Sequence, residues 1–80
     1  MRDPRTDPVK GDVLRKTRWN GKILERRVGQ LRGRDHRRKV PVVRFFEWHI
    51  DEDRCKHCGA DLANWRAWAK TATVIKRAEE

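Results

Sequence analysis

Short apolar runs separated by turn residues fill the first half of this 80-residue chain. Residues 12–16 are predicted as a first strand. The dipeptide Asn20-Gly21 then lies between two apolar-bearing segments, and it predicts a β-hairpin with a type I′ turn because both residues tolerate a positive φ. A second strand is expected over residues 23–31, where the irregular alternation predicts a bulge near Gly29.

The remaining pattern predicts two more strands and one helix. Val, Phe and Trp make residues 39–48 the clearest strand, and residues 49–59 are expected to form an acidic, cysteine-bearing connection. Asp61 is expected to cap a helix over residues 62–70, whose apolar side chains recur at helical spacing. The β-branched residues within 71–75 predict a short last strand.

These elements predict an α+β fold with a single domain over residues 11–77. The expected architecture is a small, strongly bent antiparallel β-sheet or an SH3-like barrel, with one short C-terminal helix and a short final strand, because hairpins of this size need to cover their edges. Residues 1–10 contain two prolines and no apolar periodicity, so we expect a flexible arm there, and residues 78–80 are expected to form a tail.

The composition predicts a thin core that is nevertheless folded. Charged residues make up 41% of the chain and apolar residues 36%, which approaches the composition of disordered proteins. The chain also has four Trp and two Phe, however, and disordered segments are poor in aromatic residues. We therefore expect a small domain of marginal stability.

The positive charge is concentrated at the N-terminal side. The net charge is +9, and residues 1–46 hold 15 Lys and Arg against 5 acidic residues, whereas residues 47–80 hold 6 against 7. Seven cations fall between Arg26 and Lys39. A one-sided field of this kind attracts a polyanion, which is either nucleic acid (DNA or RNA) or an acidic host protein.

We interpret the Arg-rich loop around residues 33–38 as a nucleic-acid contact. The planar fork of arginine suits bidentate contacts with phosphate or guanine, and Trp19 can stack on a base from the preceding hairpin. The alternatives are a solvated charged face for the loop and a core position for Trp19. The candidate nucleic-acid-binding residues are Trp19, Lys22, Arg26, Arg27, Arg32, Arg34, Arg37, Arg38 and Lys39.

The segment from Cys55 to Gly59 has the CxxCG pattern of a zinc knuckle. A closed structural zinc site needs four ligands, and the chain has two cysteines. The candidate ligand set for one structural zinc ion is therefore His36, His49, Cys55 and Cys58. The alternative is a reduced pair in a loop, or one cysteine buried as a small apolar residue.

The two Trp of the predicted helix and the acidic connection are candidates for packing or for protein contacts. Trp65 and Trp68 are expected to fill the core from the predicted helix, whereas an exposed Trp68 would be a protein contact. The acidic connection can pair with the basic part of the same chain or of a second copy, which leaves a monomer and a homodimer open. Its carboxylates are those of Glu47, Asp51, Glu52 and Asp53.

Several protein classes are disfavoured by the sequence. No segment has the roughly 20 apolar residues of a membrane span, and the first residues lack the apolar region of a signal peptide. We therefore expect a cytoplasmic protein that engages no membrane. No paired-carboxylate, Ser/His/Asp or phosphate-loop pattern occurs, so we expect that the chain is not an enzyme.

Two stretches resemble small accessory proteins of tailed bacteriophages and prophages. Residues 11–15 match a GDV-R opening, and residues 62–74 match an LxxWRxWAxxAxV ending. The resemblance implies an accessory phage protein in a bacterial host cell. The favoured function is nucleic-acid binding through the Arg-rich loop, in a regulatory role. The alternatives are an inhibitor or adaptor that binds a host nucleic-acid machine of transcription or defence, and a small virion assembly component.

Overall fold

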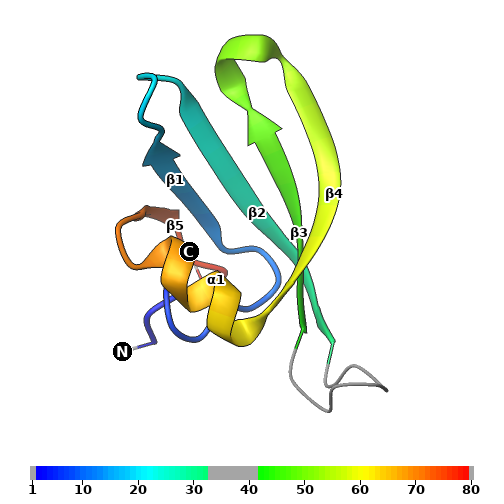
Figure 1. Cartoon of the computed structure of the whole chain (residues 1–80). Coiled ribbons are helices and arrows are strands. Elements are labelled where there is room, and N and C mark those ends of the chain that lie inside the picture. Colours follow the sequence, from blue (N-terminus) through cyan, green and yellow to red (C-terminus); the bar gives the residue numbers. More distant parts are fainter. Residues whose placement is uncertain (1, 33–41, 80) are drawn as a thin grey trace.

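The computed structural model of the chain describes residues 2–32 and 42–79, which form a five-stranded antiparallel sheet and one α-helix. Strands β4-β3-β2-β1-β5 follow one another across the sheet (Figure 1). The α+β class is therefore confirmed. The elements in chain order are β1 (Val13–Thr17), β2 (Ile23–Arg32), β3 (Val42–His49), the 3-10 turn η1 (Ile50–Glu52), β4 (Arg54–Asp61), α1 (Leu62–Ala69) and β5 (Thr73–Lys76).

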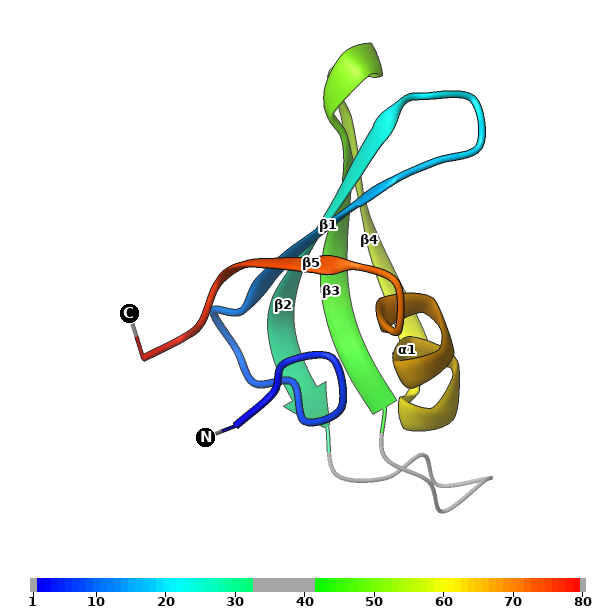
Figure 2. The ribbon, with the colours of Figure 1, turned by 90° about the vertical axis from the view of Figure 1, so that its left-hand side faces the viewer.

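The sheet is bent but open. Its edge strands, β4 and β5, stand at opposite ends of the strand order, so the sheet does not close into the barrel that was the alternative expectation. Figure 2 shows α1 on one side of the sheet, over the half of the strands that lies farther from η1. One helix can bury the apolar side chains of one sheet face, which gives the domain a core without closure of the sheet.

The first hairpin forms where the sequence predicts it, with a different turn. Arg18 and Lys22 close the loop through a hydrogen bond of 2.8 Å, and the Gly21 amide donates to the Arg18 carbonyl at 2.9 Å. Of the pair Asn20-Gly21, only Gly21 has a positive φ, 82°. The loop is thus a three-residue turn that ends in a left-handed glycine, and the predicted type I′ turn is wrong. The predicted bulge is confirmed, because the register between β2 and β3 shifts across Gly29.

Strand β4 replaces most of the connection expected over residues 49–59. Its residues are mostly exposed and poor in β-formers, so the pattern of its side chains does not predict a strand. The strand exists because its backbone pairs with β3 from Arg54 to Asp61. Asp53, at φ 50°, turns the chain between η1 and β4.

The core lies between α1 and one face of the sheet. Asp61 caps the helix as predicted, since its side chain accepts the Asn64 amide at 2.7 Å. Trp65 is fully buried and its ring lies 5.3 Å from that of Phe45. No helix in the described part of the chain is long and apolar enough to cross a bilayer. The buried cluster comprises Leu14, Val28, Val43, Phe45, Trp65, Ala69 and Ala72.

The segment expected as a flexible arm is instead packed on the domain. Pro4 and Pro8 are fully buried, and the Trp65 indole donates a hydrogen bond of 3.1 Å to the Pro4 carbonyl. Arg2 forms a two-pronged ion pair of 2.6 and 2.8 Å with buried Asp12, which also accepts the Ala78 amide at 2.7 Å. One carboxylate therefore joins both ends of the described chain, which a reading of apolar periodicity alone does not reveal.

Candidate nucleic-acid interface

Much of the predicted binding loop lies outside the described residues. This applies to Arg34, Arg37, Arg38 and Lys39, and Arg32 is placed only as the last residue of β2. Their contact with nucleic acid stays a prediction. The candidate interface is therefore built from the sheet that carries this loop.

Arg26 faces the core and not the solvent. Its guanidinium lies 4.4 Å from the Phe45 ring centroid and 4.1 Å from that of Trp68. It forms a 3.0 Å ion pair with Glu47, and both side chains are largely buried. Burial lowers the pKa of Arg26, and the charge of Glu47 opposes this effect. Arg26 thus packs between the helix and the sheet, and it is not placed for a phosphate contact.

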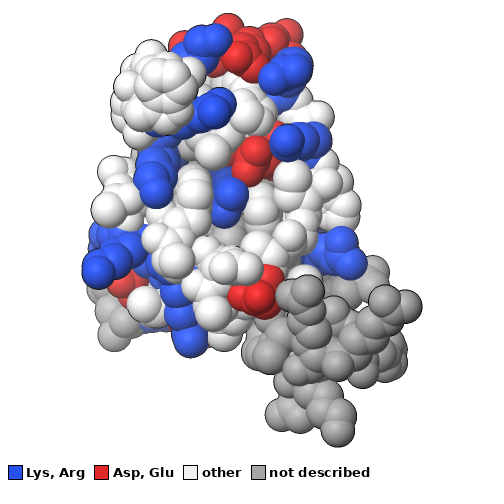
Figure 3. Space-filling model, viewed as in Figure 1, with Lys and Arg blue, Asp and Glu red and all other residues white. Residues whose placement is uncertain are grey.

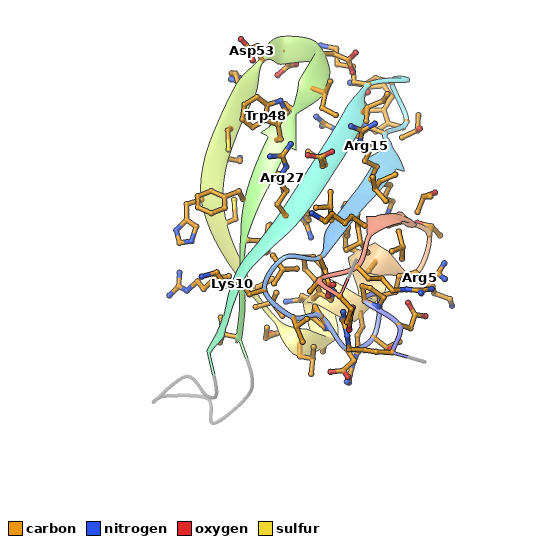
Figure 4. All side chains as sticks on the ribbon, turned by 180° about the vertical axis from the view of Figure 1, so that it is seen from behind. Arg5, Lys10, Arg15, Arg27, Trp48 and Asp53 are labelled. Atoms are coloured by element: carbon orange, nitrogen blue, oxygen red, sulfur yellow. The ribbon has the colours of Figure 1, made fainter. Side chains whose placement is uncertain are left out.

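Arg27, the next residue, projects from the opposite face of the sheet. This face, here called the outer face, is the one that α1 does not cover, and Figure 4 shows Trp48, Arg27 and Arg15 extending from it. Because alternate strand residues share a face, the register aligns the outer side chains in rows across the strands. One row holds His57, Phe46 and Arg27, and the next holds Cys55, Trp48, Glu25 and Arg15.

An exposed aromatic pair lies on the outer face at β3 and the edge strand β4. Phe46 is 46% exposed, and its ring centroid lies 5.1 Å from that of His57 on β4. The ring rests over Gly29, where an added Cβ would come within 3.3 Å of Phe46 Cε2. The bulge glycine, which has no Cβ, therefore leaves room for the Phe46 ring beside the backbone. We call Phe46 and His57 the aromatic platform.

Arginines surround the aromatic platform. The Arg27 guanidinium lies 5.8 Å from the Trp48 ring centroid, and Arg44 lies over Gly59 in the neighbouring row. By register, the outer positions include three arginines, Arg15, Arg27 and Arg44, and two carboxylates, Glu25 and the helix cap Asp61. The outer positions are residues 13, 15, 17, 23, 25, 27, 42, 44, 46, 48, 55, 57, 59, 61, 73 and 75.

Glu25 holds two of these arginines in place. It is 2% exposed, and it accepts hydrogen bonds from Arg15 Nε at 2.8 Å and from Arg27 Nε at 2.5 Å. Burial raises the pKa of Glu25, but the two guanidiniums outweigh burial and leave the pKa below its usual value. Glu25 contacts each guanidinium through Nε, so its bonds leave the terminal nitrogens to point elsewhere. The result is a pair of fixed, partly exposed cations on an uncovered face.

Trp19 is not the core residue that one alternative expected. It is 93% exposed at the tip of the first hairpin. Its neighbour Lys22 forms a 2.8 Å ion pair with Glu52. Trp19 and the half-exposed Lys22 therefore remain candidate contacts.

The acidic connection pairs within its own chain. Lys22 and Arg54 both bind Glu52 and lower its pKa to about 2, and Asp51 accepts the Ile23 amide at 2.6 Å. Figure 3 shows acidic side chains gathered at the end of the molecule where η1 lies. Lys22 and Arg54 offset part of this negative charge, so this end attracts phosphates less strongly than the arginines of the outer face do.

The two cysteines diverge in the described strand. Cys55 and Cys58 lie three residues apart on β4, so Cys55 points to the outer face and Cys58 packs against the core. His49 contacts Glu47 at 3.2 Å, and His36 lies outside the described residues. Residues 2–32 and 42–79 contain no group of three metal-ligating side chains. The zinc site stays a prediction, and a shared ion would require β4 to leave the sheet.

Phe46, His57, Glu25 and Arg15 are missing from the candidate residues that the sequence singles out, whereas Arg27 is among them. A signal for part of this site exists, because Phe46 and Trp48 alternate within β3 and so share one face. His57 has no such signal, since its strand is not predicted.

No family model matches this chain, and no curated protein and no solved structure matches it. The function is therefore inferred from the geometry and charge of its own residues.

Proposed function

We propose that this protein binds nucleic acid and that the outer face of the sheet is a contact surface. The observation that carries the proposal is the aromatic platform of Phe46 and His57 beside the fixed pair Arg15 and Arg27. Exposed rings interleaved with guanidiniums are typical of nucleic-acid surfaces, since the cations attract phosphates and the rings contact bases. The Arg-rich loop that the sequence predicts lies outside the described residues, and its contact with nucleic acid is part of this proposal.

The first prediction concerns Arg27→Ala. Loss of one phosphate contact lowers the affinity for an oligonucleotide and reduces the slope of log K against log salt concentration by about 0.7–0.9. The measurement is a titration by fluorescence anisotropy at several salt concentrations, after purification with nuclease at high salt.

Arg5→Ala is the matched control for this variant. Arg5 also forms an exposed ion pair through Nε, with Asp3 at 3.2 Å, but it lies on the N-terminal segment, away from the outer face (Figure 4). The Arg5→Ala variant removes the same charge as Arg27→Ala. We expect it to leave the slope of log K against log salt concentration unchanged. Equal losses in the two variants would mean that net charge, and not the outer face, determines binding.

A regulatory role in a phage or its host rests on the resemblance of the two chain ends alone. It stays a prediction, as do a cytoplasmic location and the absence of enzymatic activity.

A second candidate function is that of an adaptor that binds a host protein. The helix face expected for this role is packed, because Trp65 is buried and Trp68 lies against Arg26 and Lys16. The observation that favours an adaptor is instead Trp19, since a protruding Trp is a common energetic centre of protein interfaces.

Trp19→Ala separates the two functions. For an adaptor, this variant loses a nuclease-resistant complex with a host protein and keeps its affinity for oligonucleotides. If Trp19 stacks on bases, the variant loses oligonucleotide affinity instead. Pull-down from a nuclease-treated bacterial lysate and anisotropy measure the two outcomes.

A further inference from the structure

One property of the outer face is not accounted for by attraction of phosphates. Phe46 leaves 46% of its surface in solvent on a face that otherwise carries arginines, and its ring contacts the ring of exposed His57. A phenyl ring gains no electrostatic energy from a phosphate. It does gain from contact with the flat face of an unpaired base.

We propose that the ligand is single-stranded nucleic acid, with bases stacked on the Phe46–His57 platform and phosphates held by Arg27 and Arg15. The inference rests on the proposed function and names its substrate class. In a duplex, each base face is covered by the next base pair, so rings that lie on a sheet surface cannot reach it. Phe46 is such a ring, since it packs against Gly29 on the surface of the sheet.

The charge and shape of the outer face determine the path of the bound nucleic-acid strand. The carboxylates of η1 offset the cations at one end of the sheet and weaken its attraction for phosphates, so the favoured path crosses the β-strands instead of following them. Such a path leads from His57 on β4 past Arg27 to Arg15 on β1. There it meets an open groove of about 410 Å³, whose lining residues are Arg15, Lys16, Thr17, Ile23, Thr71, Thr73 and Ile75. Threonine hydroxyls in this groove can donate to phosphate or sugar oxygens.

Phe46→Leu tests the inference, because leucine keeps an apolar side chain and removes the flat ring. The probes are a fluorescent oligothymidylate, an oligouridylate and a duplex of the same thymidylate with its complement. We expect the variant to lose about 5- to 160-fold in affinity for both single strands, as the loss of one base–aromatic stack does. Its affinity for the duplex should change by less than twofold. The separate variant Phe46→Trp, which keeps an aromatic ring, should retain the single-strand affinity of the wild-type protein. Far-UV circular dichroism confirms that both variants fold.

The inference is overturned if Phe46→Leu lowers single-strand and duplex affinity equally, or lowers neither. In that case a loss of both affinities in Arg27→Ala would leave the proposed function standing. If the wild-type protein binds none of the three probes at low salt, the proposed function itself fails. The two single strands further distinguish DNA from RNA as the source of the ligand.

Discussion

Replacing Trp65 with alanine is expected to lower the free energy of unfolding by about 3–5 kcal/mol, the range for large aromatic residues in a core. Trp65 is fully buried, packs against Phe45 and binds the Pro4 carbonyl through its indole N–H. The variant therefore loses ring contacts, and it also releases the N-terminal segment. For 80 residues the whole stability is about 4–12 kcal/mol at the usual value per residue, so much of it disappears.

Urea denaturation followed by far-UV circular dichroism measures this effect. Trp19→Ala is the matched control, because it removes the same side chain from a site that is 93% exposed, and its expected change is within about 0.5 kcal/mol. Similar losses in the two variants would mean that the helix does not pack on the sheet as described.

Asp12→Asn is expected to cost about 3 kcal/mol, the low end of the range for breaking a buried charge pair. The low end applies because Arg2 keeps its 2.8 Å ion pair with Glu79. In the variant, the side-chain amide that replaces the carboxylate cannot accept all the hydrogen bonds that Arg2, Val9 and Ala78 donate to Asp12. Both chain ends are then expected to loosen.

The contribution of Asp12 depends on pH in a definite direction. Burial raises the pKa of Asp12, but the hydrogen bonds from Arg2 and from the Val9 and Ala78 amides outweigh it, so the folded-state pKa lies below the usual value. A lowered pKa stabilises the fold above the unfolded-state pKa of about 3.9, and this stabilisation is lost as the pH falls through the folded-state pKa. The difference in unfolding free energy between wild type and Asp12→Asn should therefore be full at pH 7 and shrink below about pH 3.9.

Asp3→Asn serves as the control for this experiment. Asp3 is a partly exposed carboxylate that pairs with Arg5 at 3.2 Å, so its loss should cost less than about 1 kcal/mol. A difference between wild type and Asp12→Asn that stays constant from pH 7 to pH 2 would contradict the role given to the Asp12 carboxylate.

The predictable parts of the fold are those whose signals are local. The helix follows from the Asp61 cap and the spacing of Leu62, Trp65 and Ala69, and the first hairpin follows from Gly21. Strand β4 is not predictable in this way, because its backbone pairing with β3 and not its side chains makes it a strand. The packing of the N-terminal segment depends on Asp12, whose partners lie up to 66 residues away.

The candidate site also has one part that the sequence predicts and one part that it does not. Positive charge is readable from composition, and Arg27 is found by that route. Whether an arginine faces solvent or the core is decided by strand register, which places adjacent Arg26 and Arg27 on opposite faces. The aromatic platform joins Phe46 to His57 across two strands, so it appears only when β4 is recognised as a strand.

The most direct test of the outer face is an NMR titration of the 15N-labelled wild-type protein with a short oligothymidylate. Our prediction is that the largest chemical-shift changes fall on the outer-face residues Arg15, Arg27, Phe46, Trp48 and His57, and that the Ala63 and Ala67 amides of α1 stay unchanged. Shifts confined to α1 and the N-terminal segment, or no shifts at low salt, would contradict it.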